Sequence, residues 1–101
     1  MRIKYNNILK LLRQEIEFDD EANEFINYSF EREIEAHVFF KKNFLKLEMY
    51  GERINNILNA FIEVEEAVEL GDIIEIDSKK YKVINLMKYT QHKELEMELI
   101  Q

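Results

Sequence analysis

Two histidines and many carboxylates are the residues of this chain whose chemistry could serve a site. The chain has 101 residues, of which 21 are acidic and two, His37 and His92, are histidines. General acid–base catalysis needs a base within hydrogen-bond reach of its target, and a metal site needs several converging ligands. His37 falls on the outward face of an expected strand and His92 falls in an expected turn. Both are therefore predicted to be solvent-exposed or boundary histidines. An enzyme would instead need a pocket where one of them meets carboxylates.

A run of oxygen-bearing side chains between Asp19 and Glu24 is the second candidate. A calcium loop of the EF-hand type needs a glycine at its sixth position and a glutamate at its twelfth. Counted from Asp19, those positions hold Glu24 and Phe30, so a solvated hairpin turn is predicted instead. Glycine-rich phosphate loops, HExxH and GxSxG are also missing from the sequence. The sequence thus predicts no catalytic residue, no metal site and no cofactor.

Glu94, Glu96 and Glu98 alternate with apolar residues near the C-terminus. This period is typical of a half-buried strand, with the apolar side chains inward and the glutamates outward. The plain interpretation is a solvent-facing acidic row. The functional interpretation is that many copies around an axis place this row inward, where it lines a negative channel that repels phosphate groups.

Composition limits the class of protein. Apolar residues make up 47% and aromatic residues 12%, which is enough for one modest core in one domain spanning residues 1–101. The net charge of −7 argues against tight, sequence-specific nucleic-acid binding and against anionic membranes. The absence of cysteine excludes disulfides. Because no apolar run suits a signal peptide or a membrane span, we expect a soluble protein made in the cytoplasm.

The elements that would position these side chains are mainly strands. Residues 72–76, 81–89 and 93–99 predict an antiparallel meander between Gly71 and Ile100, with a turn at residues 77–79. Residues 14–18 and 25–40 predict a hairpin around the turn at residues 19–23. Within its second strand, Ile34, Ala36 and Val38 are expected to point inward.

Three stretches leave alternatives open. Residues 58–64 fit both strand alternation and a helical stripe. Residues 3–12 fit a short amphipathic helix or the approach to the first strand. Residues 45–49 fit a short strand or an extended arm that ends at Gly51. The sum is a mainly β domain of about six short strands, a small closed or partly open antiparallel barrel or sandwich with room for one short helix.

The order of features in residues 60–100 supports a family resemblance. Gly71-Asp72 precedes a short strand, a turn at residues 77–80 follows, and then come Tyr81-x-Val83 and a final strand. This order resembles the C-terminal half of tailed-phage head–tail joining proteins, the head-closure or adaptor connectors. Residues 11–38 resemble the opening hairpin of that family more loosely. The resemblance favours the strand at residues 58–64, but Asp77-Ser78 replaces the family's Asp-Gly and leaves the turn type open.

The resemblance implies a non-enzymatic structural subunit of a phage or prophage neck. It implies a ring of six or twelve copies between the portal or adaptor protein and the tail tube or tail-completion protein. The protein would be located in the virion and made in the bacterial host cytoplasm, with no sequence-specific nucleic-acid or membrane partner. Glu94, Glu96 and Glu98 would be the channel-facing candidates.

Residues 41–56 match the variable loop through which members of that family contact neighbouring subunits, the portal or the tail. The interaction candidates are the aromatic and basic side chains around this loop: Phe39, Phe40, Lys41, Lys42, Phe44, Lys46 and Tyr50. The aromatic members would serve equally to cover the end of the barrel. The alternative function is a small acidic β-domain that binds or inhibits a basic partner protein through carboxylates with phosphate-like spacing.

Overall fold

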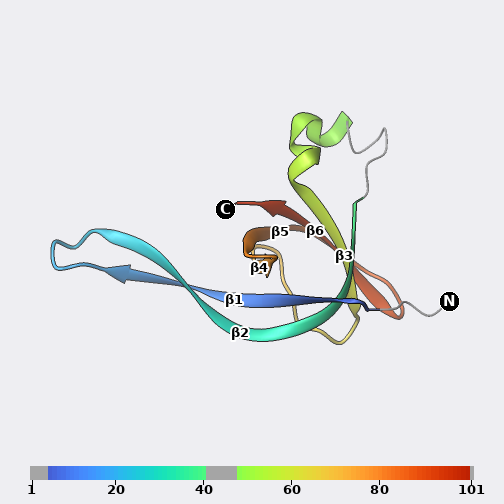
Figure 1. The fold of residues 1–101 in the computed structure, drawn as a ribbon, viewed down its shortest axis with the longest axis horizontal. Coiled ribbons are helices and arrows are strands. Elements are labelled where there is room, and N and C mark those ends of the chain that lie inside the picture. Colours follow the sequence, from blue (N-terminus) through green and yellow to red (C-terminus); the bar gives the residue numbers. More distant parts are fainter. Residues whose placement is uncertain (1–4, 41–47, 101) are drawn as a thin grey trace.

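Six antiparallel strands form one closed barrel, from which a long hairpin projects (Figure 1). The structure is a computed structural model and describes residues 5–40 and 48–100. Its elements in chain order are β1 (Asn7–Phe18), β2 (Glu24–Phe39), the 3₁₀ helix η1 (Gly51–Asn56), β3 (Ile57–Glu63), β4 (Ile73–Ile76), β5 (Lys79–Lys88) and β6 (His92–Leu99). The mainly β class and the barrel architecture predicted from the sequence are confirmed.

The barrel follows the order β1-β2-β3-β6-β5-β4 and closes where β4 pairs with β1. Only three residue pairs make this seam: Lys10 with Glu75, Leu11 with Ile74, and Leu12 with Ile73. Closure satisfies the backbone groups that an open sheet would leave at its edges. The β1–β4 seam is short because β4 itself has only four residues.

Alternating residues of all six strands fill the interior of the barrel. Ile34 and Ala36 on β2 point inward as predicted, and Leu95 and Met97 on β6 are fully enclosed. The chain between β3 and β4 covers one end, where Val68 is buried against this core. Arg32 holds this connection by an ion pair with Glu66 and a 3.0 Å hydrogen bond from its Nη2 to the carbonyl oxygen of Ala67.

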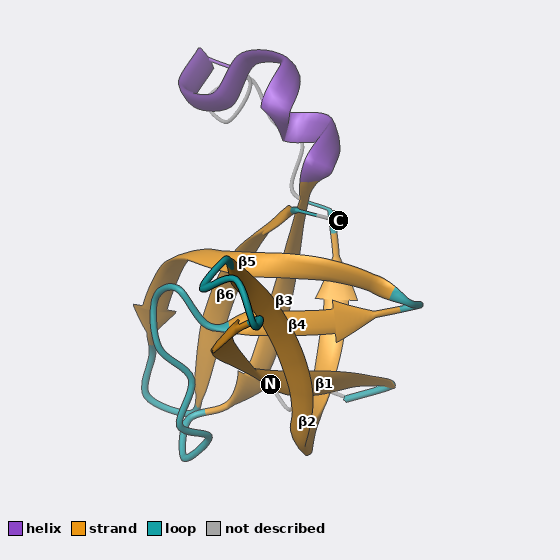
Figure 2. Ribbon diagram, turned by 90° about the vertical axis from the view of Figure 1, so that its left-hand side faces the viewer, coloured by secondary structure: helices purple, strands orange, loops and turns teal. Residues whose placement is uncertain are grey.

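The structure decides between the alternatives that the sequence left open for three segments. Residues 57–63 form strand β3 with Leu58, Ala60 and Ile62 inward, so the strand alternative is confirmed. Residues 7–12 belong to β1, and the helix alternative there is wrong. Residues 48–50 are helical and continue into η1, so the strand proposed to end at Gly51 is wrong where it is described. Figure 2 shows this helical segment standing above one end of the barrel.

The hairpin turn between β4 and β5 has two residues, Asp77 and Ser78. Both have positive φ angles, +50° and +66°. Positive φ at both central residues defines a type I′ turn, whose twist matches that of the flanking strands. The sequence left the turn type open because Ser78 stands where the family has glycine. The structure shows the type preferred in hairpins, formed here by two residues that carry side chains.

We expect the stability of the barrel to depend on Leu9, whose side chain is 0% exposed. Leu9→Ala leaves a cavity in the core, so the free energy of unfolding should fall by about 2–5 kcal/mol. The matched control is Ile8→Ala on the same strand, where the side chain is 58% exposed and the loss should be less than about 1 kcal/mol. Urea denaturation followed by circular dichroism measures both, and equal losses would contradict the inward placement of Leu9.

Candidate assembly surface

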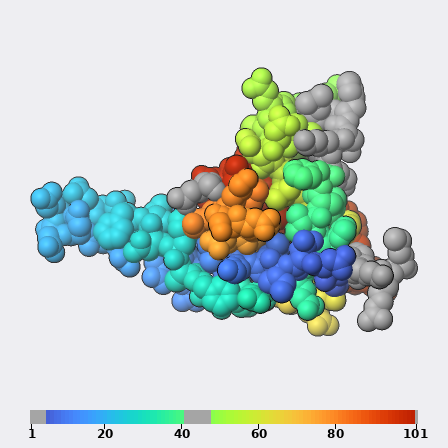
Figure 3. Space-filling model, in the orientation of Figure 1, coloured from blue at the N-terminus to red at the C-terminus, as the bar shows by residue number. Residues whose placement is uncertain are grey.

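The most prominent external feature is the part of the β1–β2 hairpin that leaves the barrel, residues 13–31, here called the arm. In the arm, β1 and β2 pair only with each other, because β4 reaches no further than Leu12 and β3 pairs only with Ala36–Phe39 of β2. The molecule measures 54 × 31 × 22 Å, and the arm accounts for its long dimension (Figure 1). Figure 3 shows the arm as a separate projection with space on both sides.

One face of the arm is apolar. The register places Ile16 opposite Ile26 and Leu12 opposite Phe30, and alternation adds Phe18 and Tyr28 to the same face. We call the exposed members Ile16, Phe18, Ile26 and Phe30 the apolar arm face. Their exposed fractions are 59%, 64%, 50% and 59%. The opposite face is mostly polar, with Arg13, Glu15, Glu17, Asn27, Ser29 and the aromatic Phe25.

The tip of the arm is a compact acidic turn. Asp19 Oδ1 accepts hydrogen bonds of 2.9 Å from the backbone N–H groups of Glu21 and Asn23. These bonds, with one from the Asn23 side chain, lower the pKa of the Asp19 carboxyl group. The predicted solvated hairpin turn is confirmed, and the carboxylates of the tip remain exposed.

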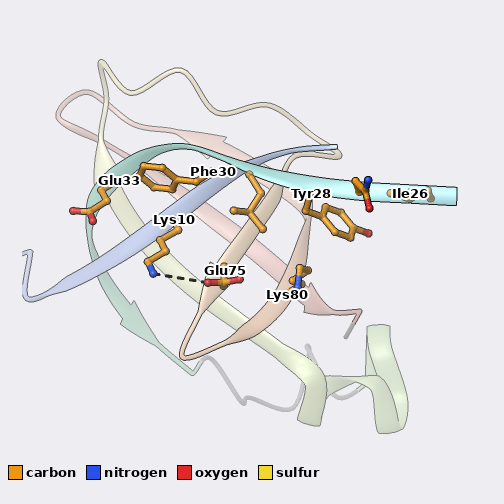
Figure 4. A pocket seen from close by; sticks show the side chains of 9 residues that line it. Lys10, Ile26, Tyr28, Phe30, Glu33, Glu75 and Lys80 are labelled. Carbon is orange, nitrogen blue, oxygen red and sulfur yellow. Dashed lines mark ion pairs between the residues drawn. The ribbon is translucent and has the colours of Figure 1, made fainter. Parts of the chain in front are cut away.

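A groove lies where the arm leaves the barrel (Figure 4). Its volume is about 550 Å³. Ile26, Tyr28 and Phe30 of the arm line one side, and Lys10, Glu75 and Lys80 of the barrel are among the residues of the other. Lys10 Nζ lies 3.9 Å from a Glu75 carboxylate oxygen, and Lys80 Nζ lies 5.4 Å from the centre of the Tyr28 ring. Glu33 also lines the groove, so it combines an aromatic wall on the arm side with two lysines and two glutamates, and Lys80 is the lysine beside Tyr28.

Six of the seven predicted interaction residues, all except Tyr50, fall into three groups. Lys41, Lys42, Phe44 and Lys46 lie outside the described residues. Phe40 is 61% exposed, at the end of β2. Phe39 is half-buried and packs on Phe61 with ring centres 4.6 Å apart.

The two histidines belong to the same aromatic cluster as Phe39. His37 stacks beside Phe39 at 5.8 Å, and His92 contacts Phe61 edge-on at 4.8 Å and Tyr89 by stacking at 4.8 Å. Both histidines are half-buried, in agreement with their prediction as boundary residues. Their neighbours are aromatic rings, and in the described part of the chain no group of three or more His, Cys, Asp or Glu side chains is arranged to hold a metal ion.

The acidic row on β6 differs from its prediction. Leu95 and Met97 point inward as expected, but the expectation that Glu94 and Glu96 face solvent is wrong: they are only 3% and 0% exposed. The reason is that polar neighbours and the helical segment at residues 48–56 cover the outer face of β6. Asn59 donates to Glu94 at 3.3 Å, and Asn85 donates to Glu96 at 3.3 Å.

Tyr50 and Arg53 attach the helical segment to this acidic row. The Tyr50 hydroxyl donates a 2.8 Å hydrogen bond to Glu96, and Arg53 donates two bonds of 2.7 Å to Glu98. The two bonds from Arg53 lower the pKa of the Glu98 carboxyl group. Burial, together with the Glu96 carboxylate, raises the pKa of the Tyr50 phenol to about 12. Tyr50 is thus tied to β6 of its own subunit.

The sequence analysis missed the apolar arm face. The alternation of Ile16 and Phe18, and of Ile26, Tyr28 and Phe30, was visible and indicated strands. Alternation alone places one face of a strand against a core. That these residues extend beyond the core follows from the pairing of β1 with the short β4, and local alternation does not indicate which strands pair.

Because the Tyr50 hydroxyl donates to Glu96, we predict that Tyr50 loses its proton at a higher pH than an ordinary tyrosine. The difference in tyrosinate absorbance between the wild type and Tyr50→Phe should have its midpoint near pH 12 in the native protein, and near the ordinary 10.0 in guanidinium. Since the folded pKa is raised, Tyr50 lends stability that is complete below pH 10 and declines as the pH rises from about 10 to 12. Rapid pH-jump absorbance measures this before unfolding. A native midpoint near 10 would show that Tyr50 does not cover Glu96.

Comparison with known proteins supports the fold. The sequence matches no protein-family model, and no curated protein sequence is detectably similar. The fold is similar to the solution structure of protein SF1141 from Shigella flexneri 2a, with a TM-score of 0.69 and 8% sequence identity. The match covers 94% of this chain and 92% of that one, so the likeness includes nearly the whole fold. In the described residues, no helix is long and apolar enough to cross a membrane.

Proposed function

We propose that this protein is a structural subunit that works by assembly, forming a ring in the head–tail connector of a tailed phage or prophage. The single observation that supports assembly most directly is the apolar arm face. Ile16, Phe18 and Ile26 are each at least half exposed on a two-stranded arm that leaves the barrel. Exposed apolar patches of this kind on a small domain are typical of protein–protein contact surfaces.

The energetics of the arm favour a partner. A two-stranded hairpin is marginally stable in water without a third strand or a packed face. Each buried Ile or Phe side chain contributes about 1.5–3 kcal/mol, so covering three of them offsets several kcal/mol of ordering and association cost. The barrel has no open edge of its own, and the arm offers two. Contacts with other subunits are therefore expected at the arm.

The assignment to a connector rests on the resemblance of residues 60–100 to head–tail joining proteins. A closed barrel with a projecting arm suits a ring subunit, because the barrel keeps its shape while the arm reaches the neighbouring copy. In this proposal the ring has six or twelve copies and lies between the portal or adaptor and the tail. The segment at residues 41–56, whose described part from residue 48 is helical, then contacts the portal or the tail.

The acidic row has a different part in this proposal. Glu94 and Glu96 are covered and hydrogen-bonded inside the subunit, so they contribute to its folding and not to the lining of a channel. The same burial withholds Glu94 and Glu96 from a basic partner, so an acidic inhibitor would have to use other carboxylates, such as those exposed at the arm tip.

The proposal is tested by mixing the purified protein with the portal or adaptor protein of the same phage or prophage. We expect rings in negative-stain images and a co-eluting complex on size exclusion with light scattering. The double variant Ile16→Ser/Ile26→Ser removes one cross-strand apolar pair and should weaken the complex by at least about 3 kcal/mol, more than a hundredfold in affinity.

The matched control is Arg13→Ser/Ser29→Ala, a cross-strand pair on the opposite face of the arm, which should leave the complex intact. Circular dichroism melting of both variants verifies that the barrel is folded. Wild-type protein that stays separate from the partner, in images and on the column, would refute the proposed function.

A further inference from the structure

The arm tip and the groove at the arm base are complementary surfaces of the same chain. Residues 15–24 contain six acidic side chains and no basic one. Strand β5 contains four lysines and no acidic residue, and one of them, Lys80, lies at the edge of the groove. The tip also carries Phe18, which is 64% exposed, and the groove has walls of Tyr28 and Phe30.

The tip of one molecule does not reach its own groove. Leu12 lines the groove and Phe18 lies six residues further along the same strand, a separation of about 20 Å in an extended chain. The two strands of the arm pair with each other from end to end, which keeps the tip pointing away. Only a second copy therefore brings these two surfaces together.

We propose that the acidic tip of the arm docks head-to-tail in the groove of the next copy. Phe18 packs on Tyr28 and Phe30, and the tip carboxylates face Lys80 and Lys82, which share the outer face of the neighbour's β5. This inference rests on the proposed function and names the contact between its subunits. Because the two surfaces differ, each copy can offer its tip to one neighbour and its groove to another, and a ring is built by this repetition.

Charge makes the docking directional. Two acidic tips repel each other, so pairings that bring two tips together are disfavoured. The lysines of β5 attract the tip instead, and this attraction weakens when salt screens it. Head-to-tail contact is the arrangement in which the apolar and the charged parts of both surfaces are paired at once.

The experiment uses the natural absence of cysteine. Two single variants, Asp20→Cys at the tip and Lys82→Cys on β5, are distinguished by a size tag and mixed in equal amounts under mild oxidation. We expect the mixed tip-to-β5 disulfide in several-fold excess over either homodimer, and a lower yield at high salt. The matched control is Lys88→Cys, a lysine at the other end of the same strand, which should give no such excess.

A charge reversal tests the polarity of the contact. Glu21→Lys on the tip variant should lower the yield of the mixed disulfide several-fold, and Lys80→Glu on the β5 variant, a charge reversal at the edge of the groove, should restore it. Circular dichroism verifies the fold of each chain. A statistical mixture of disulfides, or a predominance of tip-to-tip dimers, would overturn head-to-tail docking.

The two proposals fail separately. Rings that form with the portal or adaptor protein, combined with a statistical disulfide pattern, would retain the connector function and reject this contact. A strong tip-to-β5 disulfide without any binding of that protein would retain the contact and reject the connector function.

Discussion

The short β1–β4 seam is the constraint on which the rest of the structure depends. It consists of three residue pairs, and the last is Leu12 with Ile73. Along the seam β1 has a paired strand on each side, and up to its end β1 contributes Leu9 and Leu11 to the core. Beyond it, β1 has only β2 as a partner. The same limit therefore closes the barrel and releases the arm from it.

Beyond the seam, the arm has to remain soluble without a core. Its polar face and its acidic tip supply charge, which is one of the ways natural sheets prevent their edges from pairing at random. The shift of register between Leu11 and Leu12 adds a bulge where the arm begins, and bulges bend and twist the strand that contains them. The groove lies at this bend, between the arm and β4–β5.

The outer face of β6 illustrates how an acidic strand becomes part of the interior. Glu96 is fully buried yet accepts hydrogen bonds from Tyr50 and Asn85. A buried carboxylate is costly unless its oxygen atoms are paired in this way. With the two bonds from Arg53 to Glu98, the row attaches the helical segment at residues 48–56 to the barrel. Part of the net acidity of the chain thus serves folding.

The amino-acid sequence by itself determined the local elements. Alternation placed Ile34, Ala36, Leu95 and Met97 inward, and the polar run at residues 19–23 marked a turn, because both signals depend only on neighbouring residues. Tertiary structure alone decided which faces stayed covered. Glu94 and Glu96 are buried because segments distant in sequence lie over β6, and the apolar arm face is exposed because β4 ends before it. Alternation specifies two faces of a strand, but only the packing of other elements decides which of them meets water.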